Sequence, residues 1–210
     1  MIRILIADDH EIVRQGIKQI VSEHPGMVVV GEASNGPDAL SLALSVEFDV
    51  AIIDIAMPGR GGLEILKDIR ANKSAVKVIM LSMYSEEQYA IRSLRDGASA
   101  YLTKGNATDD LVKAIEAVAS GKRYITESVA DKLASFIEED GNRLPHENLS
   151  DRELQVLVMV GAGKSVSEIA LELSLSIKTV STYRTRLLEK MGITTNAQLM
   201  KYTLLHQLDQ

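Results

Sequence analysis

The stretch from Val50 to Gly59 constrains the fold of this chain more than any other. An unbroken apolar run, Val50 to Ile53, leads into a lone carboxylate, Asp54, and a loop with Pro58 and Gly59 follows shortly after. A segment that is apolar at every position is typical of a strand covered on both faces, as in a parallel sheet between helices. Such sheets bind ligands at the carboxyl ends of their strands. Asp54 is therefore a candidate functional residue, although alone it fits the start of a loop better.

The region from residue 1 to residue 122 alternates between strand-like and helix-like patterns. Strands are expected over 2–7, 27–33, 49–54, 76–81 and 99–102, and helices over 11–23, 37–44, 63–71, 85–96 and 108–119. This alternation predicts an α/β domain with a doubly wound, five-stranded parallel sheet, for which the flavodoxin-like strand order is the leading topology.

The pattern changes after residue 122. A helix is expected over 126–137, a polar linker over 138–148, and further helices over 150–161, 165–173, 176–191 and 195–208. We therefore divide the chain into an α/β domain (1–122), a helix and linker (123–148) and a small all-α domain (149–210). Residues 149–210 carry a net charge of +1, whereas the first 148 residues carry −7. This asymmetry predicts different partners for the two domains.

The composition excludes several classes of protein. The sequence has no cysteine, which excludes disulfide frameworks and thiolate zinc sites and indicates a reducing compartment. No apolar run approaches the roughly 18 residues that span a bilayer. The N-terminus turns acidic too soon for a signal peptide. We expect a cytoplasmic protein with no membrane partner.

Four further polar residues follow the other predicted strands. Asp8 and Asp9 follow the first strand, Ser82 the fourth and Lys104 the fifth, so all should meet Asp54 at one sheet edge. Taken singly, Asp8 and Ser82 fit helix caps, and Lys104 fits a solvated lysine. Together, three carboxylates repel one another unless a cation lies among them, and oxygen ligands favour Mg²⁺. A hydroxyl and an ammonium group are donors for phosphoryl oxygens. The set predicts Mg²⁺-assisted phosphoryl transfer to Asp54, with Asp8 and Asp9 holding the metal.

These residues carry a resemblance to a known family. The residues concerned are Asp8-Asp9, Asp54 with Met57-Pro58-Gly59, Ser82, Tyr101 and Lys104. Residues 1–120 resemble the receiver domain of two-component response regulators. The resemblance implies a phosphohistidine of a sensor histidine kinase as donor, and the backbone carbonyl of Ala56 as a further Mg²⁺ ligand. It also implies that Ser82 and Tyr101 form a switch pair, although an aromatic residue in a strand also fits simple packing.

The α/β domain departs from its family's pattern at one position. Gly105 stands where most receivers have a proline after the lysine. His10, next to the acidic pair, is expected to begin a helix rather than to bind metal.

In the all-α domain, the helix expected over 176–191 has two different faces. At 100° per residue, one face is apolar and carries Ile177, Val180, Leu187, Leu188 and Met191. The opposite face carries Lys178, Ser181, Thr182, Thr185, Arg186 and Glu189. Small polar and basic residues on a core-packed helix suit a reader of the major groove, but they also suit a plain solvated face. Arg184 points toward the apolar side, where it can pair with an acid such as Glu153 or flank a phosphate.

The motifs Leu149–Glu153, Glu168-Ile169-Ala170 and Lys178–Tyr183 resemble the LuxR-type helix-turn-helix. The resemblance implies contacts with double-stranded promoter DNA from Lys178, Thr179, Ser181, Thr182, Thr185, Arg186 and Lys190. Ser181 and Tyr183 depart from the lysine and histidine that relatives often carry. Dimerisation would double the few phosphate contacts of a +1 domain. The last helix, with Leu199, Leu204, Leu205 and Leu208, is a candidate dimer contact, and a core role is equally open for some of these leucines.

Together the two resemblances point to a NarL/FixJ-type response regulator. Its expected partners are a sensor histidine kinase, promoter DNA, a second copy of the chain on activation, and RNA polymerase. Its only expected turnover is its own phosphorylation and dephosphorylation. One alternative is a Mg²⁺-dependent aspartyl phosphatase of the haloacid dehalogenase type, which Ala56 disfavours because such enzymes carry an acid there. The other is a regulator whose helical domain binds protein.

Overall fold

The structure is a computed structural model that describes residues 1–83, 86–105, 107–138, 144–206 and 208. The chain divides into two compact units, Met1–Leu133 and Ala134–Gln210, which we describe separately. Residues 139–143 of the predicted linker lie outside the described ranges. Within those ranges, no helix is long and apolar enough to cross a membrane. The domain boundaries at residues 122 and 148 stay predictions.

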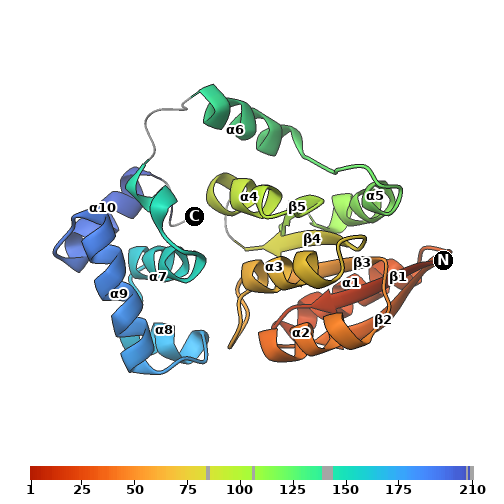
Figure 1. Cartoon of the computed structure of the whole chain (residues 1–210), viewed down its shortest axis with the longest axis horizontal. Helices are drawn as coiled ribbons and strands as arrows, with labels where there is room; N and C mark the ends of the chain where they lie inside the picture. The colour runs from red at the N-terminus through yellow and green to blue at the C-terminus, as the bar shows by residue number, and fades with distance from the viewer. Residues whose placement is uncertain (84–85, 106, 139–143, 207, 209–210) are drawn as a thin grey trace. The chain divides into compact units, whose positions relative to one another are not determined.

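The first unit is the predicted doubly wound α/β fold (Figure 1). Its strands are β1 (Ile2–Ala7), β2 (Met27–Ala33), β3 (Val50–Asp54), β4 (Lys77–Ser82) and β5 (Ala100–Thr103). They pair in parallel in the order β2-β1-β3-β4-β5, which is the flavodoxin-like order. Its helices are α1 (Glu11–Ser22), α2 (Gly36–Ser45), α3 (Gly62–Asn72), α4 (Glu86–Arg95) and α5 (Ala107–Ala119). Helix α6 (Glu127–Glu138) begins in this unit and runs across the division at Leu133.

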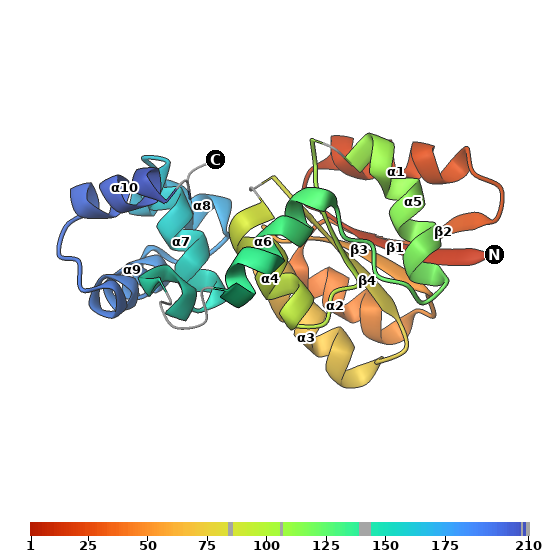
Figure 2. The same cartoon turned by 90° about the horizontal axis from the view of Figure 1, so that it is seen from above.

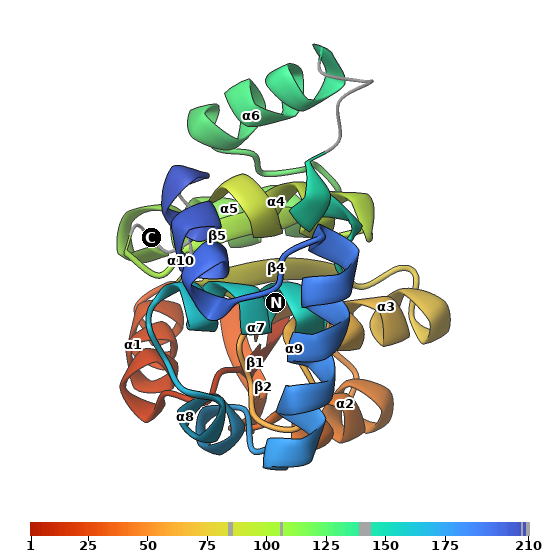
Figure 3. The same cartoon turned by 90° about the vertical axis from the view of Figure 1, so that its left-hand side faces the viewer.

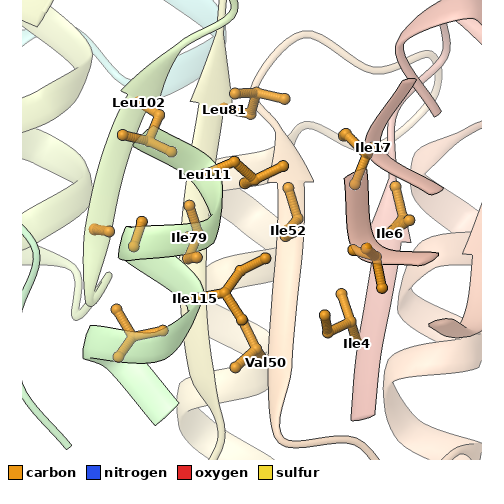
Figure 4. Close-up of a cluster of buried hydrophobic side chains, with 14 residues drawn as sticks. Ile4, Ile6, Ile17, Val50, Ile52, Ile79, Leu81, Leu102, Leu111 and Ile115 are labelled. Atoms are coloured by element: carbon orange, nitrogen blue, oxygen red, sulfur yellow. The ribbon is translucent and has the colours of Figure 1, made fainter. Parts of the chain in front are cut away.

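Helices cover both faces of this sheet, which explains the uninterrupted apolar runs in its strands. Helices α1 and α5 lie side by side on one face (Figure 2), and α2 and α3 lie on the other (Figure 3). The core under α1 and α5 is aliphatic, with Ile17, Leu111 and Ile115 packed over Ile52 and Ile79 (Figure 4). Every residue of β3 is buried. The sheet therefore holds Asp54 at the end of its central strand in a setting withdrawn from solvent.

The second unit is all-helical, as predicted. It contains a 3₁₀ turn, η1 (Pro145–Asn148), and helices α7 (Asp151–Gly161), α8 (Val166–Glu172), α9 (Ile177–Met191) and α10 (Asn196–Leu205). Helix α7 packs against α9 and α10, and α8 packs against α9. Two features differ from the prediction by more than one residue. The η1 turn lies within the predicted linker, and α10 ends at Leu205 rather than at residue 208.

The helices of the second unit begin where the sequence predicts because their caps are local. Ser150, Ser165, Ser176 and Thr195 each accept a hydrogen bond from the backbone N–H three residues further on. At Ser150 and Ser165, a glutamate three residues later closes a capping box. Only a short segment, 173–176, separates α8 from α9, and Ser174 there has a left-handed φ of 52°. This is the corner of a helix-turn-helix.

Candidate phosphoacceptor site and helix-turn-helix surface

Strand register brings the predicted polar residues to one edge of the sheet. Ala7 of β1 pairs with Ile53 of β3, so Asp8 and Asp54 are the next residues on adjacent strands. On the other side, Ser82 ends β4 opposite Thr103 of β5. The backbone N–H of Lys104 donates to the Ser82 carbonyl at 2.7 Å.

The side chain of Lys104 joins the two central carboxylates. Its Nζ lies 2.8 Å from Asp8 Oδ2 and 3.0 Å from Asp54 Oδ2. All three groups are withdrawn from solvent, with side-chain exposures of 5% for Lys104, 1% for Asp8 and 2% for Asp54. Lys104 is therefore an interior cation rather than the solvated loop lysine of the alternative interpretation.

Asp9 and His10 complete the acidic edge. His10 is the N-cap residue of α1, as expected, and its backbone N–H donates to Asp8 Oδ1 at 2.9 Å. The imidazole also faces the acids, with Nδ1 2.7 Å from Asp9 Oδ1 and 3.3 Å from Asp8 Oδ1. His10 thus begins the helix and contacts both carboxylates, which its position in the sequence did not predict.

Burial and crowding change the acid–base properties of this edge. Burial raises the pKa of Asp54 to about 6; Lys104 opposes the shift, and the neighbouring Asp8 adds to it. Burial alone would lower the pKa of Lys104, but Asp54 and Asp8 outweigh it and raise that pKa, so the lysine stays charged. The site holds an excess of negative charge that one ammonium group does not neutralise.

The donor set fits a hard divalent cation. Ligand atoms of Asp8, Asp9, His10 and Asp54 all lie within 4.8 Å of one another. In this structure Asp8 Oδ2 and Asp54 Oδ2 face Lys104 Nζ, and Asp9 Oδ1 faces His10 Nδ1, so each of these buried oxygens lies beside a nitrogen. Clustered carboxylate oxygens are the ligands that Mg²⁺ prefers in proteins. Ala56 lies two residues after Asp54 in the loop, and the role of its carbonyl stays a prediction.

A glycine that the sequence reasoning missed holds the loop after β3 in place. A Cβ on Gly62 would lie 2.1 Å from the backbone oxygen of Asp54. The Gly62 N–H donates to the Ile55 carbonyl at 3.0 Å, which folds the start of α3 back onto the end of β3. Only a residue without a side chain permits this approach. The signal was present in the sequence as Gly61-Gly62, directly before an apolar helix.

The two predicted switch residues are both buried. Ser82 and Tyr101 are each 1% exposed, at the end of β4 and within β5. The ring of Tyr101 is therefore already in the interior in this structure.

The polar face predicted for α9 is exposed. Lys178, Ser181, Thr182, Thr185 and Arg186 are all exposed, whereas Val180 and Leu187 are fully buried. Thr179 is only partly exposed, and its hydroxyl contacts the cap, with Oγ1 2.8 Å from Ser176 Oγ. The predicted DNA contacts themselves stay predictions.

Two expectations for the helical unit need correction. Ile177, predicted for the apolar face, is 57% exposed. It is the first residue of α9 and lies beyond the edge of the core, whereas Val180, three residues later, is fully buried. Arg184 does not pair with Glu153; its Nε donates to Asn196 Oδ1 at 2.7 Å. Glu153 instead accepts a hydrogen bond from Lys190 Nζ at 2.6 Å. Lys190, a predicted DNA contact, is therefore paired with a buried glutamate in this structure.

The leucines predicted for the last helix fall into two groups. Leu199 and Leu208 are buried, with 0% and 3% exposure, and belong to the core. Leu204 and Leu205 are 67% and 68% exposed. Only the second pair remains available for the predicted dimer contact.

Both units of the chain match families of known proteins. Residues 4–116 match the family model of the response regulator receiver domain, and residues 147–203 match that of bacterial regulatory proteins of the luxR family. The response regulator UvrY of Escherichia coli strain K12 is 41% identical over 209 residues, which cover 99% of this chain and 96% of UvrY. The response regulator GacA of Pseudomonas aeruginosa is 37% identical over 207 residues, covering 98% of this chain and 97% of GacA.

Solved structures extend the likeness to the whole chain. RcsB from Salmonella enterica serovar Typhimurium, bound to promoter DNA in the presence of the phosphomimetic BeF₃⁻, has a TM-score of 0.66 and 28% identity. The match covers 96% of this chain and 98% of that chain. An RcsB–DNA complex gives a TM-score of 0.61 at 29% identity, covering 97% and 98%.

The fold and the acidic edge define a response regulator. The chain belongs to the NarL/FixJ-type family of two-component response regulators, DNA-binding transcription regulators that join a receiver domain to a LuxR-type helix-turn-helix domain.

Proposed function

We propose that this regulator is switched on when its receiver accepts a phosphoryl group on Asp54 from a phosphohistidine of a sensor histidine kinase. The supporting observation is the ion-pair chain Asp8–Lys104–Asp54, in which one interior ammonium lies 2.8 and 3.0 Å from two buried carboxylates. A carboxylate held beside a cation that can contact phosphoryl oxygens suits nucleophilic attack on phosphorus.

In the proposed reaction a carboxylate oxygen of Asp54 attacks phosphorus, the N–P bond breaks, and the imidazole leaves with the bonding electrons. Lys104 Nζ and the Ser82 hydroxyl donate hydrogen bonds to phosphoryl oxygens. Mg²⁺, when bound, supplies positive charge that offsets the charge on those oxygens. The groups that would hold it are Asp8, Asp9, Asp54 and the carbonyl of Ala56. Hydrolysis of the aspartyl phosphate returns the protein to its resting state, and we assign no other turnover.

The proposed output is tighter binding to promoter DNA as a dimer. Because Tyr101 already lies in the interior, we infer that phosphorylation stabilises an existing conformer through Ser82 rather than creating a new one. The residues proposed to contact DNA are Lys178, Thr179, Ser181, Thr182, Thr185, Arg186 and Lys190. The exposed pair Leu204 and Leu205 is the proposed dimer contact. We place this activity in the cytoplasm, with RNA polymerase as a further partner on the promoter. The proposed domain limits are 1–122 for the receiver, 123–148 for the helix and linker, and 149–210 for the DNA-binding domain.

Intact-mass analysis tests the acceptor. After treatment with acetyl phosphate and Mg²⁺, we expect the full chain to gain one phosphoryl group, and Asp54→Asn to gain none. Asp49→Asn is the matched control, because Asp49 pairs with Arg3 at 3.0 Å outside the site, and this variant should be phosphorylated normally. A phosphoryl adduct on Asp54→Asn would refute the assignment.

A further inference from the structure

Ile177 is an apolar residue exposed at the start of the helix that carries the proposed DNA-contacting face. It is the first residue of α9, directly after the N-cap Ser176, and 57% of it is accessible to solvent. The core does not need it, since Val180 is fully buried one turn further on. In a helix-turn-helix the N-terminal residues of the second helix reach the base edges.

Two of the hydroxyl groups that follow Ile177 along α9 already donate hydrogen bonds within the helix. The Thr182 hydroxyl donates to the Lys178 carbonyl at 2.9 Å, and the Thr185 hydroxyl donates to the Ser181 carbonyl at 3.0 Å. Each of these threonines therefore presents lone pairs and a methyl group rather than a free O–H. Positive charge for the phosphates comes from the exposed Lys178 and Arg186.

The lone pairs and methyl groups of these threonines can be matched with groups that bases present in the major groove. In the major groove, thymine presents a C5-methyl group, and adenine and cytosine present amino donors; only the thymine methyl offers an apolar contact. Resting on the proposed DNA-binding function, we propose that Ile177 contacts the methyl group of a thymine near the end of each half-site and so sets a base preference there. The probe that isolates this contact is deoxyuridine, which lacks only that methyl group.

The experiment has two stages. A preferred duplex is first selected from random DNA with the full-length wild-type protein. Each thymine in it is then replaced by deoxyuridine, and the affinities of wild type, Ile177→Ala and Ile12→Ala are measured. Ile12 is the matched control, because it is an 82% exposed isoleucine near the start of α1 in the other unit.

At one thymine position of each half-site, we expect deoxyuridine to weaken wild-type binding about fourfold, the worth of one buried methyl group. Ile12→Ala should show the same loss. Ile177→Ala should bind thymine and deoxyuridine equally at that position, so the two changes are not additive. Equal losses in wild type and Ile177→Ala at every position would overturn this inference and leave DNA binding intact. Failure of wild type to enrich any sequence would overturn the proposed function as well.

Discussion

Among single residues, Asp54 lies in a buried setting that lowers the stability of the folded protein. Its carboxyl group is 2% exposed at the end of a buried strand, and its pKa is raised from 3.8 to about 6. The folded state therefore binds the proton more tightly than the unfolded state does, so stability falls as the pH rises from about 4 to about 6. Above about pH 6 the Asp54 carboxylate is ionised in both states, and the free energy of unfolding is lowered by the whole cost that the pKa shift represents.

Asp54→Asn should therefore stabilise the metal-free receiver at pH 7.5. We expect a gain of about 1–3 kcal/mol in the free energy of unfolding, since two pKa units correspond to roughly that cost. The gain should vanish below about pH 4, where the wild-type group is protonated in both states. Urea unfolding across this pH range measures it. A variant that is less stable than wild type at pH 7.5 would contradict this account of the site.

Replacing Gly62 should disturb the end of β3 without removing a functional group. In Gly62→Ala the new methyl group would meet the Asp54 backbone oxygen at 2.1 Å, so we expect a loss of about 1–3 kcal/mol and slower phosphorylation. Gly31→Ala in β2 is the control, because its methyl group would meet the side chains of Leu5 and Leu42 at ordinary distances of 3.8 and 3.9 Å. Rates of phosphoryl uptake close to wild type in Gly62→Ala would refute the steric argument.

Site residues could be predicted from the sequence where the order of strands alone fixes their positions, and not where loop geometry does. Asp8, Asp54 and Ser82 could be predicted because parallel strands bring their carboxyl ends together whatever the side chains do. The contacts of His10 and the closeness of Gly62 to Asp54 could not, because they depend on loop geometry. The exposure of Ile177 was also missed, since a helical wheel treats the first residue of a helix like one in its middle.

Among the helices, glycines have opposite roles in α1 and α7. A Cβ on Gly161, the last residue of α7, would lie 2.4 Å from Thr203 Oγ1 in α10, whereas a Cβ on Gly16 in α1 would meet nothing within 4 Å. Gly161→Ala should therefore destabilise the helical unit by about 1–3 kcal/mol through overpacking. Gly16→Ala should stabilise the receiver by about 1 kcal/mol through helix propensity. Hydrogen exchange of amides in the two units measures each effect. Effects of the same sign would contradict the packing described.

Helix starts were more predictable than helix ends. The starts of α7, α8 and α9 are set by serine caps within three residues. The end of α10 at Leu205 depends on tertiary packing, because Leu208 turns back into the core while Leu204 and Leu205 stay exposed. Periodicity alone assigned all three leucines to one continuous helix.

For the whole molecule, the salt dependence of DNA binding reports how many protomers contact the duplex. Each lysine–phosphate contact contributes close to one unit to the slope of log affinity against log salt concentration. Lys178→Ala should reduce that slope by about two for a dimer on paired half-sites. Lys201→Ala, an exposed lysine of α10, is the control and should leave it unchanged. A reduction of about one would indicate a single protomer on the DNA.

The central claim is that phosphorylation of Asp54 in the first unit controls DNA binding by the second. The most direct test is the affinity of the full chain for its selected duplex, with and without acetyl phosphate and Mg²⁺. We predict an increase of about 5- to 150-fold for wild type, the usual range of coupling between two sites, and no change for Asp54→Asn. Equal affinity of wild type in both conditions, or an increase that persists in Asp54→Asn, would contradict the account.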